Sequence, residues 1–109
     1  MDFIEIGGRK RPVRYGWNAL AEFGKLTGIG LNDIAFVEKE GQTYLSMQFA
    51  DLLSLIYVGL KYGARKEGEK VDFTVEDIGD WMDNEDVSKM HEFINLFVEQ
   101  MPKAKKKES

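Results

Sequence analysis

The stretch from Ser46 to Arg65 constrains this chain most, because it predicts one long helix that is apolar on more than one side. The main apolar stripe has the three- and four-residue spacing of a helix and comprises Phe49, Leu52, Leu53, Ile56, Tyr57 and Leu60. Leu55 and Val58 lie off that stripe. Such a helix would be about 30 Å long, roughly the width of a small domain. We therefore expect it, capped by Ser46, to form the centre of the fold or to keep a face for a partner.

The length of 109 residues, of which 43% are hydrophobic, suits one domain with a genuine core. We place this domain at residues 1–102 and expect residues 103–109, which hold four lysines, to be a disordered basic tail. The most apolar stretch, from Phe49 to Leu60, is shorter than the roughly 20 residues of a membrane span. The first residues also lack the order of a signal peptide. We therefore expect a soluble, cytoplasmic chain.

A β-hairpin is predicted over the first fifteen residues. Gly7 and Gly8 can supply the positive φ angles of a hairpin turn between two short strands. On the returning strand we expect Val13 and Tyr15 to share one face and the arginines to lie near solvent. Pro12 cannot donate a ladder hydrogen bond, which places this strand at an edge or makes Pro12 its first residue.

Two further helices are predicted between the hairpin and the long helix. The first begins near Trp17 and ends at Gly28, a residue suited to the left-handed terminating position. Its expected apolar stripe comprises Ala19, Leu20, Phe23 and Leu26. Asn32 could cap a second, short helix that continues through Val37 and ends in the polar turn 38–42.

Two more helices are predicted after the long one. Thr74 and Asp77 have the spacing of a capping box, and Asn84 restarts the chain as a final helix. The apolar side of that helix comprises Val87, Met90, Ile94, Phe97, Val98 and Met101. The predicted fold class is therefore α+β and predominantly α-helical, with an N-terminal β-hairpin followed by four to five helices around a long central helix.

The residue types exclude much enzymology. The absence of cysteine excludes disulfides, thiolate catalysis and cysteine-based metal sites, and His91 is the only histidine. The acidic run 80–86 lacks the ligand spacing and glycine of a calcium loop. The glycines between 24 and 30 follow a helix, whereas a phosphate loop precedes one. We predict no catalytic residue, no cofactor and no metal, and expect His91 at the boundary of an apolar stripe.

Charge is distributed unevenly along the chain, whose net charge is −4. The segment 9–14 holds four bases and no acid, whereas the segment 67–92 holds ten acids and two lysines. Such runs are solvated faces or electrostatic docking surfaces for a partner or for copies of the same chain. The net negative charge disfavours nucleic acid as a partner.

Five apolar residues are our candidates for a groove that binds a partner helix. Leu55 is chosen because it lies off the main stripe, and the methionines because thioether side chains adapt to varied surfaces. The candidates are Met47, Leu55, Met90, Phe97 and Met101.

The pattern over residues 11–100 resembles the tail assembly chaperones of long-tailed bacteriophages and prophages. The residues that carry the resemblance are Arg14–Phe23 (RYGWNALAEF), Leu26–Leu31 (LTGIGL), Ile56–Lys61 (IYVGLK) and Phe73–Ile78 (FTVEDI). Gly24 stands where that family commonly has an acid. The match falls mainly on helix caps and core positions.

This resemblance implies a small, non-enzymatic helical protein that acts in the cytoplasm of the bacterial host. It would bind the tape-measure protein, recruit tail-tube subunits and leave before the particle is mature. Self-association and the absence of a membrane partner fit the same role. Two alternatives from other classes stay open. One is a small nucleic-acid-associated regulator that uses the basic hairpin Arg9–Arg14, and the other is a structural tail or head–tail component.

Overall fold

Two antiparallel hairpins and four helices form the fold in the computed structural model, which describes residues 2–30, 33–34 and 36–101. The strands are β1 (Asp2–Ile6), β2 (Arg9–Val13), β3 (Phe36–Lys39) and β4 (Gln42–Leu45). The helices are α1 (Trp17–Thr27), α2 (Phe49–Lys66), α3 (Val75–Met82) and α4 (Val87–Gln100). This arrangement confirms the predicted α+β, predominantly helical class with an N-terminal hairpin. The predicted basic tail, 103–109, lies outside the described residues.

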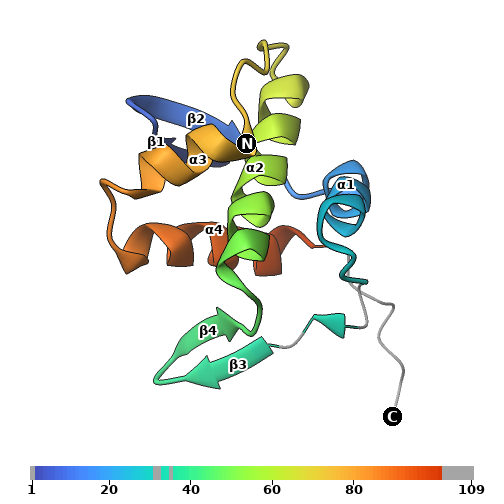
Figure 1. Ribbon diagram of the computed structural model, residues 1–109, viewed down its shortest axis with the longest axis vertical. Coiled ribbons are helices and arrows are strands. Elements are labelled where there is room, and N and C mark those ends of the chain that lie inside the picture. Colours follow the sequence, from blue (N-terminus) through green and yellow to red (C-terminus); the bar gives the residue numbers. More distant parts are fainter. Residues whose placement is uncertain (1, 31–32, 35, 102–109) are drawn as a thin grey trace.

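Helix α2 is the centre of the fold, as its sequence predicts. It contacts β2, α1, α3 and α4, and Figure 1 shows α1 and α3 on opposite sides of it. Because α2 has neighbours on several sides, its off-stripe residues Leu55 and Val58 are buried together with Ile56 and Leu60. The helix begins at Phe49 with Gln48 as its N-cap, so the prediction that Ser46 caps it is wrong.

Two glycines let the first hairpin approach α2 closely. A Cβ atom at Gly59 would lie 2.4 Å from the Tyr15 ring, and one at Gly63 would lie 2.1 Å from the Pro12 carbonyl oxygen. The Arg14 amide donates to the Gly59 carbonyl at 3.0 Å, and the Tyr15 hydroxyl donates to the Leu55 carbonyl at 2.8 Å. The hairpin is thus attached to α2 by backbone contact as well as by apolar packing.

The local stop and turn signals mostly hold. Gly7 and Gly8 have φ angles of 63° and 89° in the β1–β2 turn, and Gly28 ends α1 with φ 76°. Thr74 and Asp77 form the predicted capping box at the start of α3. The last helix begins at Val87 with Asp86 as its cap. The prediction that Asn84 restarts the chain as this helix is thus two residues too early for the cap.

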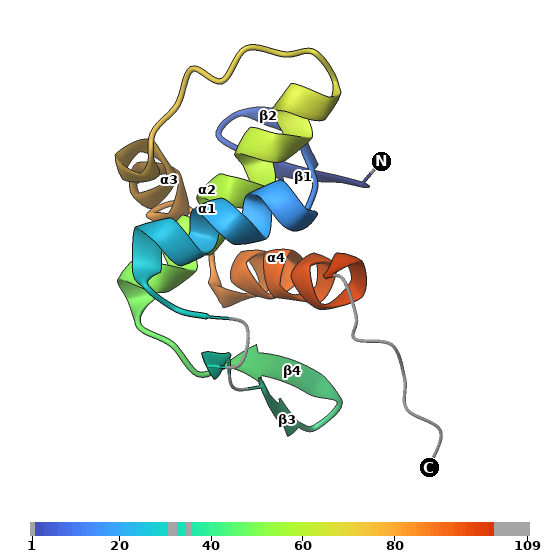
Figure 2. The ribbon, with the colours of Figure 1, turned by 90° about the vertical axis from the view of Figure 1, so that its right-hand side faces the viewer.

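The predicted short helix through Val37 is wrong, because the chain forms the β3–β4 hairpin there. Strand β3 pairs with β4 in antiparallel register, from Phe36 opposite Leu45 to Lys39 opposite Gln42. Glu40 and Gly41 turn the chain with φ angles of 52° and 79°. Figure 2 shows this hairpin beyond α4, at the end of the molecule away from β1 and β2. Asn32, the expected cap of the predicted short helix, lies outside the described residues.

Two side chains of the N-terminal half differ from the prediction in their burial. Arg11 is only 9% exposed, although we expect the arginines near solvent. Its Nε donates to the Ile6 carbonyl at 2.8 Å and its guanidinium lies 4.3 Å from the Trp81 ring centroid. Leu26, predicted for the core stripe of α1, is exposed instead. Helical spacing selects the side of α1, but burial at each turn depends on which other elements reach it.

Candidate partner-binding groove

The five candidates for a partner-binding groove do not form one surface. Leu55 and Phe97 are 0% exposed, so their assignment to an open groove is wrong. Leu55 belongs to the core because α2 is covered on several sides. Phe97, on α4, belongs to it because its ring packs edge-on against Tyr15, with 5.4 Å between the ring centroids. Met47, Met90 and Met101 are half-buried against the core. Of these five residues, Met90 lines the groove described next.

An apolar groove of about 760 Å³ lies between the first turns of α2, helix α3 and the first half of α4. Its floor is lined by half-buried side chains, most of which pack against the buried core. They are Leu52, Leu53, Val75, Met82 and Met90. Ile94, which is buried, closes the floor along α4, and half-buried His91 lies beside it.

Two large apolar side chains at the edge of the groove are strongly exposed. Phe49 is 85% exposed at the first position of α2, and Val87 is 69% exposed at the first position of α4. Exposing a phenylalanine in water costs the free energy that its burial would release, about 1.5–3 kcal/mol. Both residues would recover part of that free energy if a partner covered them.

The rim of the groove is acidic. The linker between α3 and α4 and the exposed face of α3 contribute its carboxylates, which are Glu76, Asp80, Asp83, Glu85 and Asp86. Asp86 accepts a hydrogen bond from the Ser88 amide at 2.9 Å, and hydrogen bonds from Ser88 lower its pKa. The carboxylates of the rim favour a partner with basic residues beside its apolar ones.

The local sequence explains how the groove is built. The capping box at Thr74 begins α3, whose last turn leads directly into the acidic linker 83–86. The Asp86 cap then restarts the chain as α4. The linker 83–86 lies at the surface and separates the two helices. Helices α3 and α4 therefore both pack on α2 and leave a depression between them.

Sequence reasoning misplaced two groove residues, because helical spacing puts Phe49 on the core stripe of α2 and Val87 on the apolar side of α4, whereas both are exposed. The position of Phe49 could have been anticipated. One signal was present, since a first-turn residue has no preceding turn of its own helix beside it. Phe49 is exposed because it lies at the edge of the groove that α3 and α4 leave open beside the first turn of α2. The spacing of apolar residues within α2 does not show how far its neighbouring helices reach.

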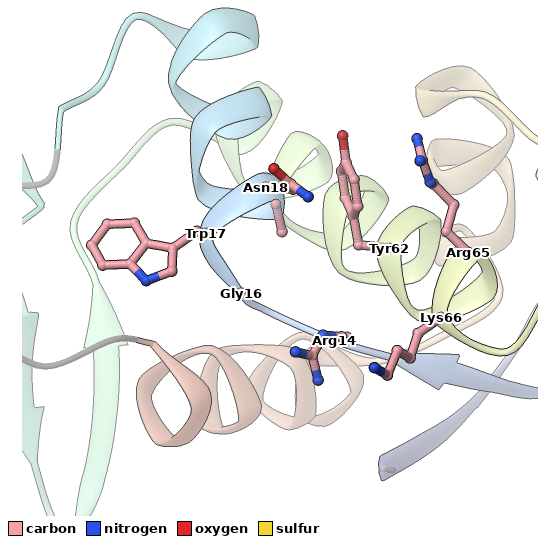
Figure 3. A pocket seen from close by; sticks show the side chains of 8 residues that line it. Arg14, Gly16, Trp17, Asn18, Tyr62, Arg65 and Lys66 are labelled. Atoms are coloured by element: carbon pink, nitrogen blue, oxygen red, sulfur yellow. The ribbon is translucent and has the colours of Figure 1, made fainter.

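A second pocket, of about 420 Å³, lies at the junction of α1 with the last turns of α2 and is basic. Arg14, Arg65 and Lys66 line it together with Trp17 and Tyr62. In Figure 3, Arg65 and Tyr62 extend in one direction from α2, whereas Arg14 and Lys66 lie on the other side of the opening. Trp17 is 71% exposed at the start of α1.

A polar network supports the wall of this second pocket. Lys61 and Tyr62 both donate to Glu22, at 2.7 Å each. Burial raises the pKa of Glu22, but the hydrogen bonds from Lys61 and Tyr62 lower it more, so that its net pKa is below the ordinary value. The hydrogen bond to Glu22 raises the pKa of Lys61 in turn. This network links α1 to α2 next to the basic side chains.

What these surfaces can do chemically is bind another molecule through apolar and charged contacts. Within the described residues, no group of three or more His, Asp or Glu side chains is placed to hold a metal ion. No helix in that part of the chain is long and apolar enough to cross a bilayer. Comparison with protein-family models, curated proteins and solved structures finds no match to this chain.

Proposed function

We propose that this protein is a non-enzymatic tail assembly chaperone of a long-tailed phage or prophage, which binds a helical segment of the tape-measure protein in the groove between α2, α3 and α4. It would act in the cytoplasm of the bacterial host and help to recruit tail-tube subunits before leaving the particle. The observation that carries the proposal is an apolar groove whose edge exposes Phe49 and Val87.

The groove has the properties of a helix-binding site. A partner helix presents apolar side chains at positions i, i+3, i+4 and i+7, which dock in a row along an apolar depression. Met82 and Met90 in the floor can adapt to side chains of different shape, as a chaperone for a long, varied helical protein requires. The acidic rim favours segments in which lysine or arginine flanks the apolar stripe.

The resemblance to the chaperone family supports the same proposal. Its quoted residues include the left-handed terminator Gly28 and the capping box Thr74–Asp77. These residues determine where helices stop and start, so they account for a shared fold more directly than for a shared partner. The proposal therefore rests on the groove together with the resemblance.

The nucleic-acid regulator receives less support from the basic hairpin. Arg11 turns inward and donates to the carbonyls of Ile6 and Gly7, and Arg9 pairs with Glu69 at 3.3 Å. Two of the four bases in the segment 9–14 are thus engaged within the protein. A phosphate backbone needs several free cations on one face.

Co-expression with the tape-measure protein of the phage or prophage that carries this gene tests the proposal. We expect the chain to co-purify with it, and Phe49→Glu to reduce capture at least tenfold, because a carboxylate replaces an apolar contact beside an acidic rim. Leu26→Glu is the matched control, since Leu26 is also an exposed apolar residue but lies on α1, outside the groove. Equal capture by the wild type and both variants would contradict the groove assignment.

Analysis of purified particles separates the chaperone from a structural tail component. We expect mass spectrometry to detect the chain in cells that assemble tails and to find it absent from finished particles. A stoichiometric amount in finished particles would favour the structural role instead.

A further inference from the structure

The basic pocket at the junction of α1 with the last turns of α2 concentrates positive charge in an acidic chain. Three cationic side chains line it from two distant parts of the sequence, Arg14 before α1 and Arg65 and Lys66 at the end of α2. The chain holds 19 aspartate and glutamate residues and has a net charge of −4. None of the described residues that line this pocket is acidic. The fold therefore separates these three cations from the acidic side chains.

The three cations have no ion-pair partner among the described residues. None of the salt bridges in that part of the chain involves Arg14, Arg65 or Lys66, and all three side chains are exposed. The carboxylate of Glu22, on α1, is already engaged by Lys61 and by the Tyr62 hydroxyl. An anion that entered the pocket would thus meet positive charge from three side chains at once.

The cations reach the opening of the pocket from two sides. In Figure 3, Arg14 and Lys66 lie on one side, and Tyr62 and Arg65 lie on the other. The Arg14 side chain lies beside the start of α1, because a Cβ atom added at Gly16 would be 3.7 Å from its Nε. The Arg65 guanidinium is 5.6 Å from the centroid of the Tyr62 ring. The first turn of α1, which also lines the pocket, holds no acidic side chain.

A phosphate group fits this arrangement better than a carboxylate does. A phosphate presents three strong acceptor oxygens that point in different directions. A carboxylate presents two oxygens in one plane, which the fork of a single arginine can satisfy. The volume of about 420 Å³ lies within the range of about 300–1,000 Å³ that is typical of small-molecule sites. Two adjacent phosphates would allow cations on both sides of the opening to be used.

We propose that the basic pocket binds a small molecule that carries a diphosphate group. Its phosphates lie between Arg14 and Lys66, and Arg65 contacts them from the side of Tyr62. A free small molecule is favoured over a nucleic acid strand, because the net negative charge of the chain opposes binding along a phosphate backbone. The pocket lies at the end of α2 opposite the apolar groove, so this inference does not depend on the partner proposed for that groove.

An NMR titration of the full chain with inorganic pyrophosphate and with ADP provides the first test. In about 0.1 M NaCl, where the Debye length is about 10 Å, both should cause saturable shifts of backbone amide signals. The largest shifts should fall at residues 14–19 and 62–66, and the groove residues Phe49 and Val87 should change little. The absence of saturable shifts with both probes at millimolar concentration would overturn the proposal, as would shifts centred on the groove.

A charge-neutralising variant tests whether the pocket itself holds the phosphates. The variant Arg14→Gln with Arg65→Gln and Lys66→Gln should weaken pyrophosphate binding at least about tenfold, because it removes three charge-assisted contacts. A matched control changes the net charge equally at exposed positions outside the pocket and should bind as the wild type does. It combines Lys25→Gln, Lys39→Gln and Lys70→Gln.

Equal weakening of pyrophosphate binding by this variant and its control would overturn the proposal, because binding would then follow net charge alone. If circular dichroism shows that the triple variant is unfolded, the single change Lys66→Gln replaces it, with Lys70→Gln as its control. Weaker binding by Lys66→Gln alone is then the expected result, and equal binding by the two single variants would overturn the proposal.

Two further probes identify the chemistry and the source of the anion. Succinate, a small dicarboxylate, should bind at least about tenfold more weakly than pyrophosphate, because its carboxylates offer fewer acceptor oxygens. Equal affinity for the two would overturn the assignment to phosphate. A short oligothymidylate should bind no more tightly than ADP. Binding of the oligonucleotide that is tighter at least about tenfold, and lost in the pocket variant, would assign the pocket to a nucleic acid backbone and overturn the proposal.

Discussion

Replacing Gly63 by alanine should destabilise the protein, although alanine is the better helix former. Gly63 lies inside α2, where it faces the end of β2. An added Cβ atom would lie 2.1 Å from the carbonyl oxygen of Pro12, 2.4 Å from its carbonyl carbon and 2.7 Å from the Val13 nitrogen. All three are backbone atoms, so no side-chain rotation can remove the overlap.

The expected change in unfolding free energy combines two destabilising contributions and one stabilising contribution. Ordinary contacts between such atoms lie at about 3.5–4.0 Å, so β2 would have to move away from α2 by about 1 Å or more. Overpacking of this kind typically costs about 1–3 kcal/mol. The movement also stretches the hydrogen bond from the Arg14 amide to the Gly59 carbonyl, now 3.0 Å, which contributes about 1 kcal/mol. Alanine returns about 1 kcal/mol through its helix propensity.

The expected net loss is therefore about 1–3 kcal/mol, which corresponds to a fall in Tm of roughly 5–15 °C for a domain of this size. Thermal and urea unfolding followed by circular dichroism would measure it. Gly79→Ala in α3 is the matched control. There the nearest atom to an added Cβ would be the Leu53 Cδ1 at 3.7 Å, an ordinary contact, so the change should stabilise the protein by up to about 1 kcal/mol. Equal stabilisation by both substitutions would refute the close approach of β2 to α2.

Arg11→Lys should cost about 1–3 kcal/mol of unfolding free energy, measured in urea, because lysine cannot reproduce both carbonyl contacts and the stacking on Trp81; stability equal to that of the wild type would show that charge alone suffices. Glu22→Gln should destabilise the protein at pH 7. The pKa of Glu22 is lowered on folding, so the ionised carboxylate stabilises the fold above its unfolded pKa of about 4.3, and this stabilisation is lost as pH falls through the lower folded value. The difference between wild type and Glu22→Gln should accordingly shrink toward zero below about pH 4, and a difference that stays constant down to pH 2 would contradict the lowered pKa.

Much of the fold could be predicted from sequence because its signals are local. Gly7-Gly8 specifies a positive-φ turn between two short strands, and Gly28 specifies a left-handed helix end. The capping box at Thr74 needs only two side chains three residues apart. In each case the physical cause is contained within a few neighbouring residues, and the structure confirms it.

The β3–β4 hairpin shows where local signals become ambiguous. Its turn consists of Glu40 and Gly41, a weaker signal than Asn-Gly or Gly-Gly because glutamate seldom adopts a positive φ angle. The apolar residues before the turn fit a short helix or a short strand almost equally well. The pairing of β3 with β4 therefore decided the matter.

The sequence by itself determined the α+β class, the central helix and the first hairpin with its Gly7-Gly8 turn. It also determined the end of α1 at Gly28 and the capping box at Thr74. Only the tertiary structure decided that Leu55 and Phe97 are core while Phe49 and Val87 lie open at the edge of a groove. Likewise it turned Arg11 inward and gathered Arg14 and Lys66 around a basic pocket. Periodicity reports which side of a helix is apolar, but burial depends on which neighbouring elements reach each turn, and those neighbours come from distant parts of the chain.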